Sequence, residues 1–425
     1  METPEEIVVL PKKKPKRRFL WLLTIPAFLV ILILSLQIHA VQTWGGHRLA
    51  SYLSSEWNRK VEIDRVRIDL WARVVLDGLY IEDHKGDTLL YAKELHMATY
   101  SFSSSNSRLE SQSISLIEPN IEFKRYAGET EWNYQFLSDY FSSDTPKDTT
   151  SNFSMWVGKM KVENGKFTYY DYTLPLAEEG AFYEEQLAIS HFSTEIENFE
   201  MKGEVIQANI ETLKFNERSG LNVENLHAHL RMEGNAIQVT ELDADLGETH
   251  LVGDIGIYAP NDEAWNDFNN KVNWDIHFKP TELVLNDLSA FSSDLKGFDN
   301  VFKLEGDISG PLNDLSLWNM NLSFGRHSHF KGNVHLLNAM NSDSLRYELA
   351  VSSLSSDYQD ISALKSYPFD EGKFMELPSN IATLGKIQFE GNARGDIDAL
   401  DLYGKTRTEI GSLTTAIHMS DFDSL

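Results

Sequence analysis

The chain has 425 residues, no cysteine, and a formal net charge of −26 at neutral pH. A surface this acidic repels nucleic acid, which argues against DNA or RNA as a partner. The lack of cysteine excludes disulfides and a cysteine-linked lipid anchor. This length accommodates two or three ordinary domains or one elongated repeat structure.

A basic tail, residues 1–18, opens the chain, with six Lys and Arg against three Glu. Removing its charge of +3 leaves −29 for residues 19–425. Positive charge beside a membrane span favours the cytoplasmic side, so we expect this tail to stay in the cytoplasm. The residues that set this topology are Lys12, Lys13, Lys14, Lys16, Arg17 and Arg18.

Residues 19–41 contain no Asp, Glu, Lys or Arg and predict a single transmembrane signal anchor. As a helix they rise roughly 35 Å, enough for a hydrocarbon core of roughly 30 Å. The predicted anchor residues are Phe19, Trp21, Leu22, Leu29, Val30, Ile31, Leu32, Ile33, Leu34 and Val41.

Two alternatives to an anchor are a cleaved signal peptide and a buried helix of a soluble protein. A signal peptide has an apolar region of about 7–15 residues and a small-x-small cleavage site. Here the apolar region is longer, and the best site, Ile38-His39-Ala40, has a bulky residue where a small one is needed. A soluble core helix is rarely this apolar behind six basic residues. The anchor therefore places the body across the membrane.

The next stretch, residues 42–58, places Leu49, Leu53 and Trp57 on one helical face. Gly45-Gly46 is expected to act as a hinge after the span. This helix could lie on the membrane surface or cap the first strands, and we favour the cap. It opens a predicted N-terminal β region, residues 42–141.

From Lys60 the apolar period changes to two, which predicts short half-buried strands separated by turns. A helical or irregular piece rich in aromatics is expected at 131–141. Residues 142–152 are predicted to be a polar linker. Residues 153–425 are then predicted to form a repeat-like β-sheet groove, with a hairpin turn at Asn164-Gly165 and no βαβ alternation.

Two segments 85 residues apart resemble each other, beginning at Phe302 and Ile387. Glu305-Gly306 matches Glu390-Gly391, and Gly310 matches Gly395. A looser third copy contains Met232-Glu233-Gly234. Such a ladder is typical of a quasi-one-dimensional repeat, and its glycines suit turns and bulges.

No motif for catalysis is present. Gly404-Lys405-Thr406 resembles the end of a phosphate-binding loop, but the required earlier glycine is Ala399. His227-x-His229 and His327-x-His329 each offer two imidazoles without a third ligand at a persuasive spacing. Asp243-x-Asp245 and Asp396-x-Asp398 do not continue into a calcium loop. We expect no enzyme, no catalytic residue, no cofactor and no metal site.

The basic tail, the single anchor, residues 61–95 (VEIDRVRIDLWARVVLDGLYIEDHKGDTLLYAKEL) and the later glycine repeats resemble the AsmA-like superfamily. The closest resemblance is to TamB-type translocation and assembly module proteins of Bacteroidota-like bacteria, strongest in 12–137 and 301–420. It implies a mainly β fold, with a transmembrane helix followed by an elongated, curled β-sheet with an apolar interior. Relatives continue further, so the chain is expected to correspond to their N-terminal part, truncated at its C-terminus.

The resemblance implies a bacterial inner-membrane protein, single-pass, with its body in the periplasm and a role in outer-membrane biogenesis. That role would be phospholipid transfer between membranes, assembly and translocation of outer-membrane proteins, or both. The expected partners are the inner membrane, phospholipid acyl chains and an outer-membrane assembly protein. The alternatives are a periplasmic scaffold without lipid cargo and an enzyme on a β-helix, for which no motif is present.

Overall fold

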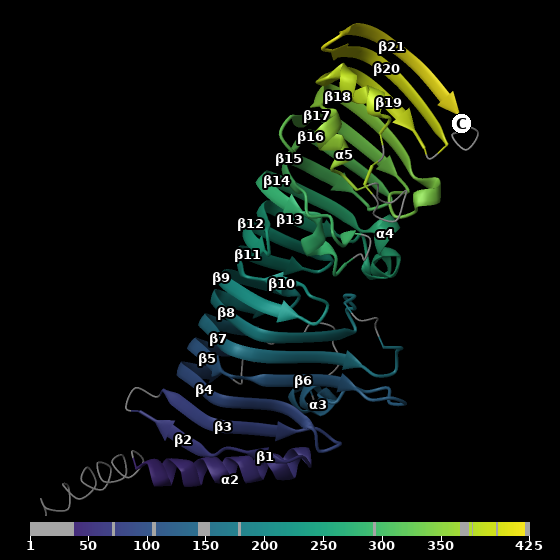
Figure 1. Cartoon of the computed structure of the whole chain (residues 1–425). Helices are drawn as coiled ribbons and strands as arrows, with labels where there is room; N and C mark the ends of the chain where they lie inside the picture. Colours follow the sequence, from purple (N-terminus) through teal and green to yellow (C-terminus); the bar gives the residue numbers. More distant parts are fainter. Residues whose placement is uncertain are drawn as a thin grey trace, which may run out of the picture.

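The computed structural model describes residues 38–69, 73–103, 108–142, 154–176, 180–291, 295–365, 374–375, 377–396 and 398–420. These residues are mainly β, as predicted, and form one mixed sheet of 21 strands (Figure 1). The helices are α2 (His39–Trp57), α3 (Gln135–Ser142), α4 (Phe268–Lys271) and α5 (Tyr358–Ser362), with 3-10 turns η1 (Asp262–Asp267), η2 (Leu285–Leu288), η4 (Ser342–Ser344) and η5 (Ser379–Leu384).

The strands are β1 (Val61–Glu62), β2 (Arg65–Ile68), β3 (Val74–Glu82), β4 (Thr88–Ser103), β5 (Arg108–Ile117), β6 (Asn120–Arg125), β7 (Ser154–Asp171), β8 (Gln186–Lys202), β9 (Val205–Glu217), β10 (Asn222–Val223), β11 (Asn225–Glu233), β12 (Ala236–Leu246), β13 (Thr249–Tyr258), β14 (Asn273–Val284), β15 (Val301–Gly310), β16 (Asp314–Phe324), β17 (Ser328–Leu337), β18 (Arg346–Ser356), β19 (Ile387–Gly395), β20 (Ala399–Thr408) and β21 (Gly411–Ser420).

Neighbouring strands follow the order of the chain. β1 and β2 both pair with β3, and β4 pairs with β3, β5 and β6. From β7 to β21 the long strands form an antiparallel meander. β5 and β6 run parallel to β7, with α3 in the connection. The sequence prediction missed this crossover, because one eight-residue helix produces no alternating pattern.

α2 lies against the edge strand β2, and two of its side chains form the backbone hydrogen bonds that a neighbouring strand would otherwise form. The Gln42 Nε2 donates to the Ile68 carbonyl at 2.7 Å, and the Ile68 N–H donates to Gln42 Oε1 at 2.9 Å. Thr43 Oγ1 makes the same two contacts with Val66 at 3.4 and 3.3 Å. These bonds satisfy backbone groups that an edge strand otherwise exposes. The predicted capping role of this helix is confirmed.

Two details of that prediction were wrong. Gly45 and Gly46 lie within α2 and form no hinge. A Cβ added at Gly46 would lie 2.2 Å from Val66 Cγ2, so this glycine lets the helix approach β2 closely. Leu49 is 54% exposed, whereas Leu53 and Trp57 do pack on the core.

The predicted hairpin at Asn164-Gly165 was also wrong, because β7 runs unbroken through it. Asn164 adopts the left-handed conformation (φ +50°) that this dipeptide favours, but it forms a β-bulge. Its N–H donates to Ser193 Oγ at 3.0 Å on β8. The sequence correctly predicts a left-handed residue at Asn164, but this residue forms a bulge within β7 and not a hairpin turn.

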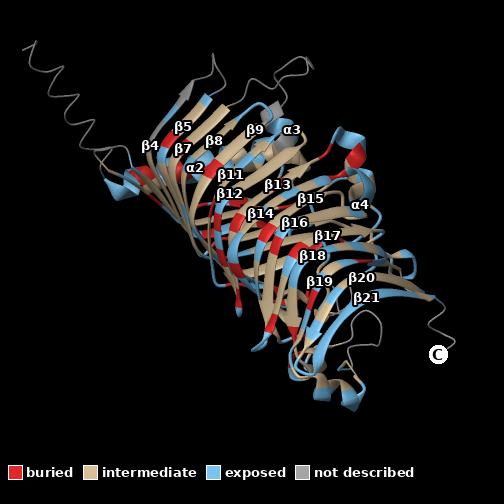
Figure 2. Cartoon of the chain, turned by 90° about the horizontal axis from the view of Figure 1, so that it is seen from above, coloured by how far each residue is buried: buried red, intermediate tan, exposed pale blue. Residues whose placement is uncertain are grey.

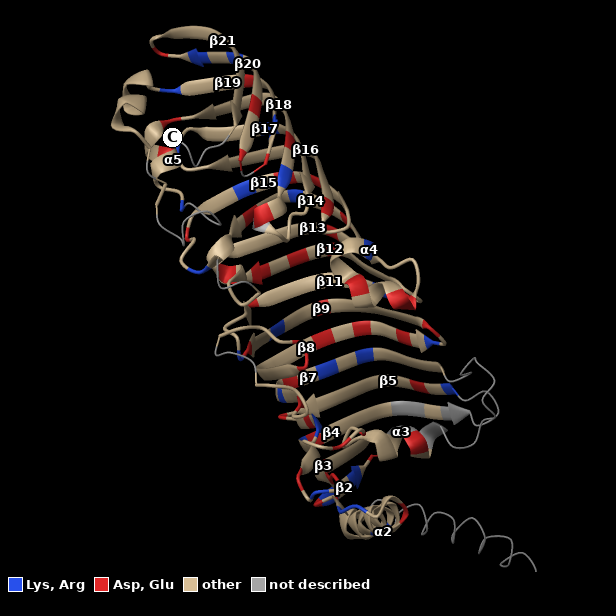
Figure 3. Ribbon diagram, turned by 90° about the vertical axis from the view of Figure 1, so that its right-hand side faces the viewer, with Lys and Arg blue, Asp and Glu red and all other residues tan. Residues whose placement is uncertain are grey.

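Similar bulges recur along the sheet. Glu241 and Asn319 have φ of +54° and +55°, and their N–H groups donate to Asp254 and Asn333 on the next strand at 2.8 and 2.9 Å. Bulges bend strands and increase their twist. In Figure 1 the sheet is curled along its whole length, with α2 at one end, and Figure 3 shows α4 and α5 on opposite rims.

Among the described residues, buried apolar side chains form three small clusters, and others, such as Val157 and Val284, are buried singly along the strands. The first joins α2 to the first strands, the second lies on β11 and β12, and the third lies beside η1 and α4. Figure 2 shows the intermediate colour over much of the sheet, whereas β21 is mostly exposed. The sheet therefore has no single filled core.

Candidate functional site: the inner face of the sheet

The strand register separates the sheet into two faces of different chemistry. On β15 and β16, Leu304 stands opposite Leu322, whereas the preceding Lys303 stands opposite Ser323. Directly opposed residues share a face, and consecutive residues alternate between faces. We call the Leu304 side the inner face and the Lys303 side the outer face.

The inner face carries no Asp, Glu, Lys, Arg or His at any strand position from β11 to β21, as the pairing assigns them. Leu, Ile, Val, Phe and Met dominate it. On β16 and β18 its apolar residues include Leu315, Leu317, Met320, Leu322, Phe324, Leu349, Val351 and Leu354.

Most of these side chains are half-buried, although few described elements lie over them. α2 and α3 cover the inner face of the first strands, and η1 and α4 contact Ile257 on β13. The three buried clusters of the described residues all precede β14, and the later inner face has scattered buried apolar side chains, Met320, Val351, Phe389 and Ala393. From β14 to β21 the inner face is thus an extended apolar surface that the described helices leave largely uncovered, a feature typical of a binding surface.

The bulges place their extra residues on the outer side of the sheet. At the bulge in β16, Trp318 and Asn319 together stand opposite a single residue of β17, Asn333, on the outer side. An extra outer residue lengthens that side of the strand and bends it toward the inner side. Because bulges of this kind recur from β7 to β18, the bending adds up along the sheet.

Glycines face these bulges where the backbones approach closely. Gly306 has φ +148°, and a Cβ there would lie 2.5 Å from Met320 Sδ. Gly391 has φ +156°, with the Tyr403 carbonyl 2.1 Å from such a Cβ. The predicted structural role of these two glycines is confirmed. The third copy was misaligned, because Gly234 lies in the β11–β12 turn and Gly253 is the mid-strand equivalent.

The outer face is polar and crossed by ion pairs. Lys303 Nζ lies 2.6 Å from Glu282 Oε1, and Arg394 Nε lies 3.0 Å from Asp401 Oδ2. Figure 3 shows Lys and Arg on β7 beside Asp and Glu on β8. Exposed pairs of this kind stabilise little and keep the surface hydrated. The outer face also has an open depression of about 720 Å³ with Trp318 and Tyr403 among its lining residues.

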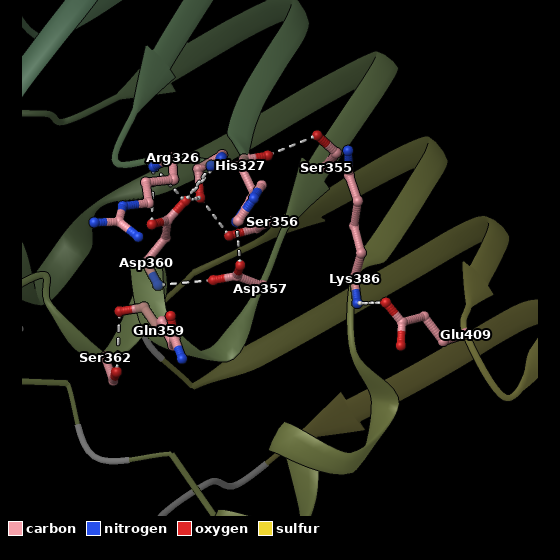
Figure 4. A network of polar contacts seen from close by, with 11 residues as sticks. Arg326, His327, Ser355, Ser356, Asp357, Gln359, Asp360, Ser362, Lys386 and Glu409 are labelled. Carbon is pink, nitrogen blue, oxygen red and sulfur yellow. Dashed lines mark hydrogen bonds and ion pairs between the residues drawn. The ribbon is translucent and has the colours of Figure 1, made fainter.

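Two aspartates, the buried Asp360 and the half-buried Asp287, hold hairpin turns at the rim, and sequence reasoning missed both. Asp360 of α5 accepts N–H bonds from Arg326, His327 and Ser328 at 2.7–3.1 Å in the β16–β17 turn (Figure 4). Asp287 of η2 accepts from Glu248 and Thr249 at 2.9 and 2.8 Å in the β12–β13 turn. Burial opposes ionisation of Asp360, but the N–H donors outweigh it and lower its pKa. Asp357 is a typical N-cap residue and indicates the start of α5, but no sequence pattern indicates that Asp360 contacts the β16–β17 turn.

The two His-x-His pairs differ in how their imidazoles are grouped with acidic side chains. The ligand atoms of His227, His229 and Glu241 lie within 4.8 Å of one another, because the β12 bulge brings up the carboxylate that spacing did not reveal. The second such group is His327, Asp357 and Asp360, in which Asp360 already accepts the turn N–H groups. 

Gly404-Lys405-Thr406 lies in the middle of β20, paired on both sides. It therefore forms no phosphate-binding loop.

The predicted topology residues and all predicted anchor residues except Val41 lie outside the described residues. Val41 belongs to α2, which begins two residues before it. None of the helices in the described part of the chain has the length and apolarity needed to span a bilayer.

Comparison with known protein families, with curated proteins and with solved structures finds no match for this chain.

Proposed function

We propose that the inner face is a conduit for lipid acyl chains in a protein anchored in the bacterial inner membrane. The single observation that carries the proposal is the uncharged, largely uncovered inner face from β14 to β21. Each CH₂ removed from water contributes about 0.8 kcal/mol. An acyl chain lying along this face would therefore be held mainly by burial, without specific polar contacts.

The polarity of the two faces supports the same role. A conduit through the periplasm needs a surface that repels acyl chains outside and accepts them inside. The outer face supplies charged pairs such as Lys303–Glu282, while the inner face supplies Leu304 at the adjacent position. The curvature produced by the bulges shelters the apolar side from water.

The resemblance to AsmA-like, TamB-type proteins supports the wider context. We propose on that basis that residues 1–18 are cytoplasmic, that 19–41 span the inner membrane and that the sheet extends into the periplasm. Its partners would be phospholipids and an outer-membrane assembly protein, and its role outer-membrane biogenesis by lipid transfer, protein assembly or both. No catalytic step belongs to this proposal.

Native mass spectrometry of the full-length protein, extracted in mild detergent, tests the conduit. Leu322→Lys places a charge on the inner face, and Asn321→Lys places the same charge on the outer face one residue away. Wild type and Asn321→Lys are expected to retain phospholipid, and Leu322→Lys to lose most of it. A folded wild-type protein that retains no lipid would favour the scaffold alternative.

A further inference from the structure

A second candidate binding surface lies at the end of the sheet nearest the predicted anchor. Here α2 and the edge strand β2 border an open depression of about 720 Å³, lined by His39, Thr43, Trp44, His47, Arg65 and Arg67. The α2 residues of this lining lie in the last turn of the predicted span or directly after it, because the span ends at Val41. In the proposed topology this depression therefore lies at the level of the lipid headgroups.

Its charge is unlike that of the rest of the chain. The whole sequence has 64 Asp and Glu against 38 Lys and Arg, yet none of the described residues lining the depression is acidic. Two guanidinium groups and two imidazoles converge instead. Arginine presents five N–H donors in a planar fork that matches the oxygens of phosphate.

Two carboxylates, Asp77 on β3 and Glu94 on β4, lie beside the two arginines, and Arg67 Nη2 is 3.7 Å from Glu94 Oε2. Arg67 Nη2 lies 2.5 Å from Asp77 Oδ1, and Arg65 Nε lies 4.0 Å from Asp77 Oδ2. The Asp77 side chain is 22% exposed, whereas the Arg65 and Arg67 side chains are 64% and 40% exposed. The guanidinium groups are thus held in place while much of their surface remains open to a ligand.

Trp44 adds the contact expected at a membrane surface. Its side chain is 62% exposed, and the Arg48 guanidinium lies 5.6 Å from the ring centroid. Tryptophan is enriched at the interface between hydrocarbon and water, where one edge of the ring is apolar and the N–H is hydrated. An exposed tryptophan beside two arginines suits a ligand with a phosphate and an apolar tail.

We infer that this depression, on the outer side of β2 where Arg65 and Arg67 stand opposite Asp77 and Val75, binds the phosphate of a phospholipid headgroup at the membrane surface. The inference rests on the proposed function, because it takes the ligand to be the lipid that the conduit carries. Arg65 and Arg67 hold the phosphate oxygens, and Trp44 lies beside the glycerol and the first acyl carbons.

The test uses the full-length protein in nanodiscs with a photoreactive aromatic amino acid, p-benzoylphenylalanine, which keeps an aromatic ring at position 44 in place of Trp44 or, separately, replaces Leu322. Crosslinks are counted with phosphatidylglycerol and with an uncharged galactosyl diacylglycerol of the same acyl chains. The variant is Arg65→Gln with Arg67→Gln. The control is Arg73→Gln, whose side chain is as exposed as that of Arg65 and pairs with Asp69 at the same end of the sheet.

At position 44 the wild type and Arg73→Gln are expected to crosslink phosphatidylglycerol at least fivefold more than the glycolipid. The double variant is expected to lose that preference. Equal crosslinking of both lipids by the wild type, or a preference unchanged in the double variant, overturns the site. If inorganic phosphate, equimolar with phosphatidylglycerol, abolishes the crosslink, the site binds the free ion, and the proposal that its ligand is a lipid is overturned. Lipid crosslinks from position 44 without lipid crosslinks from position 322 would instead overturn the proposed conduit but still support the headgroup site.

Discussion

At the scale of single residues, the curvature depends on glycines that have a bulge opposite them. Gly306 combines a positive φ with a Met320 side chain and a Trp318 carbonyl where a Cβ would stand. The resemblance between residues 302–310 and 387–395 revealed these glycines, but not the backbone contacts that require them.

Gly306→Ala is expected to lower the free energy of unfolding by about 1–3 kcal/mol, through backbone strain and steric overlap. Urea denaturation followed by circular dichroism measures this change. Gly86→Ala is the control, since Gly86 also has a positive φ (+87°) but no atom within 4 Å of an added Cβ. An equal loss in both variants would mean that the bulge contact contributes nothing.

Asp360 should couple the stability of the rim to pH. Its pKa is lowered from the ordinary value of 3.8, so its contribution is full above that value and disappears as pH falls through the lower folded-state pKa. Asp360→Asn is expected to cost about 1–3 kcal/mol at pH 7, because buried N–H groups lose a charged acceptor. The difference from wild type should shrink below about pH 4.

Urea midpoints of wild type and Asp360→Asn at pH 7, 5 and 3 check that expectation. Asp343→Asn, an exposed carboxylate on η4, serves as the control and should change nothing. A stability gap that stays constant from pH 7 to pH 3 would contradict the assigned role of the ionised carboxylate.

At the scale of elements, local patterns predicted which residues form strands and helices better than where chains turn. The period-two alternation from Lys60 predicted the β character, and the 42–58 pattern predicted α2. Asn164-Gly165 misled because its left-handed preference serves both a hairpin and a bulge. The pairing of β7 with β5, β6 and β8 favours the bulge over the hairpin, and these long-range pairings leave no signal in the local sequence.

The two glycines of α2 offer a matched pair. Gly45→Ala is expected to stabilise the protein by about 0.5–1 kcal/mol, because alanine favours the helix and nothing lies within 4 Å. Gly46→Ala is expected to destabilise it by about 1–3 kcal/mol, since the methyl group meets Val66. Thermal unfolding curves of both variants decide the point. Equal shifts in the two would mean that α2 does not pack on β2 as described.

At the scale of the whole molecule, stability is shared among neighbouring strands rather than stored in one core. Sheets of this kind behave as ladders in which each strand depends on its neighbours. β21 pairs with β20 along one edge, and its Leu413 and Ile417 are 63% and 38% exposed. The sequence predicts the repeat and the alternation of apolar and polar residues along the strands. It does not predict which residues form the inner face, because a one-residue slip in register exchanges the two faces.

Hydrogen exchange should therefore vary along the ladder. Amides of β20 and β21 are expected to exchange at least tenfold faster than those of β11 and β12, where Ala228, Leu242 and Ala244 form a buried cluster. Exchange followed by mass spectrometry with peptide resolution measures this difference. Uniform protection along the sheet would point to one cooperative unit instead of a ladder.

The central claim is that lipid lies along the inner face. The most direct measurement is photo-crosslinking in living cells from adjacent residues that face opposite sides, Leu304 against Lys303 and Leu349 against Glu348. We predict phospholipid crosslinks from Leu304 and Leu349 and none above background from Lys303 and Glu348. Crosslinks to protein alone, or equal lipid labelling from both members of each pair, would contradict the conduit.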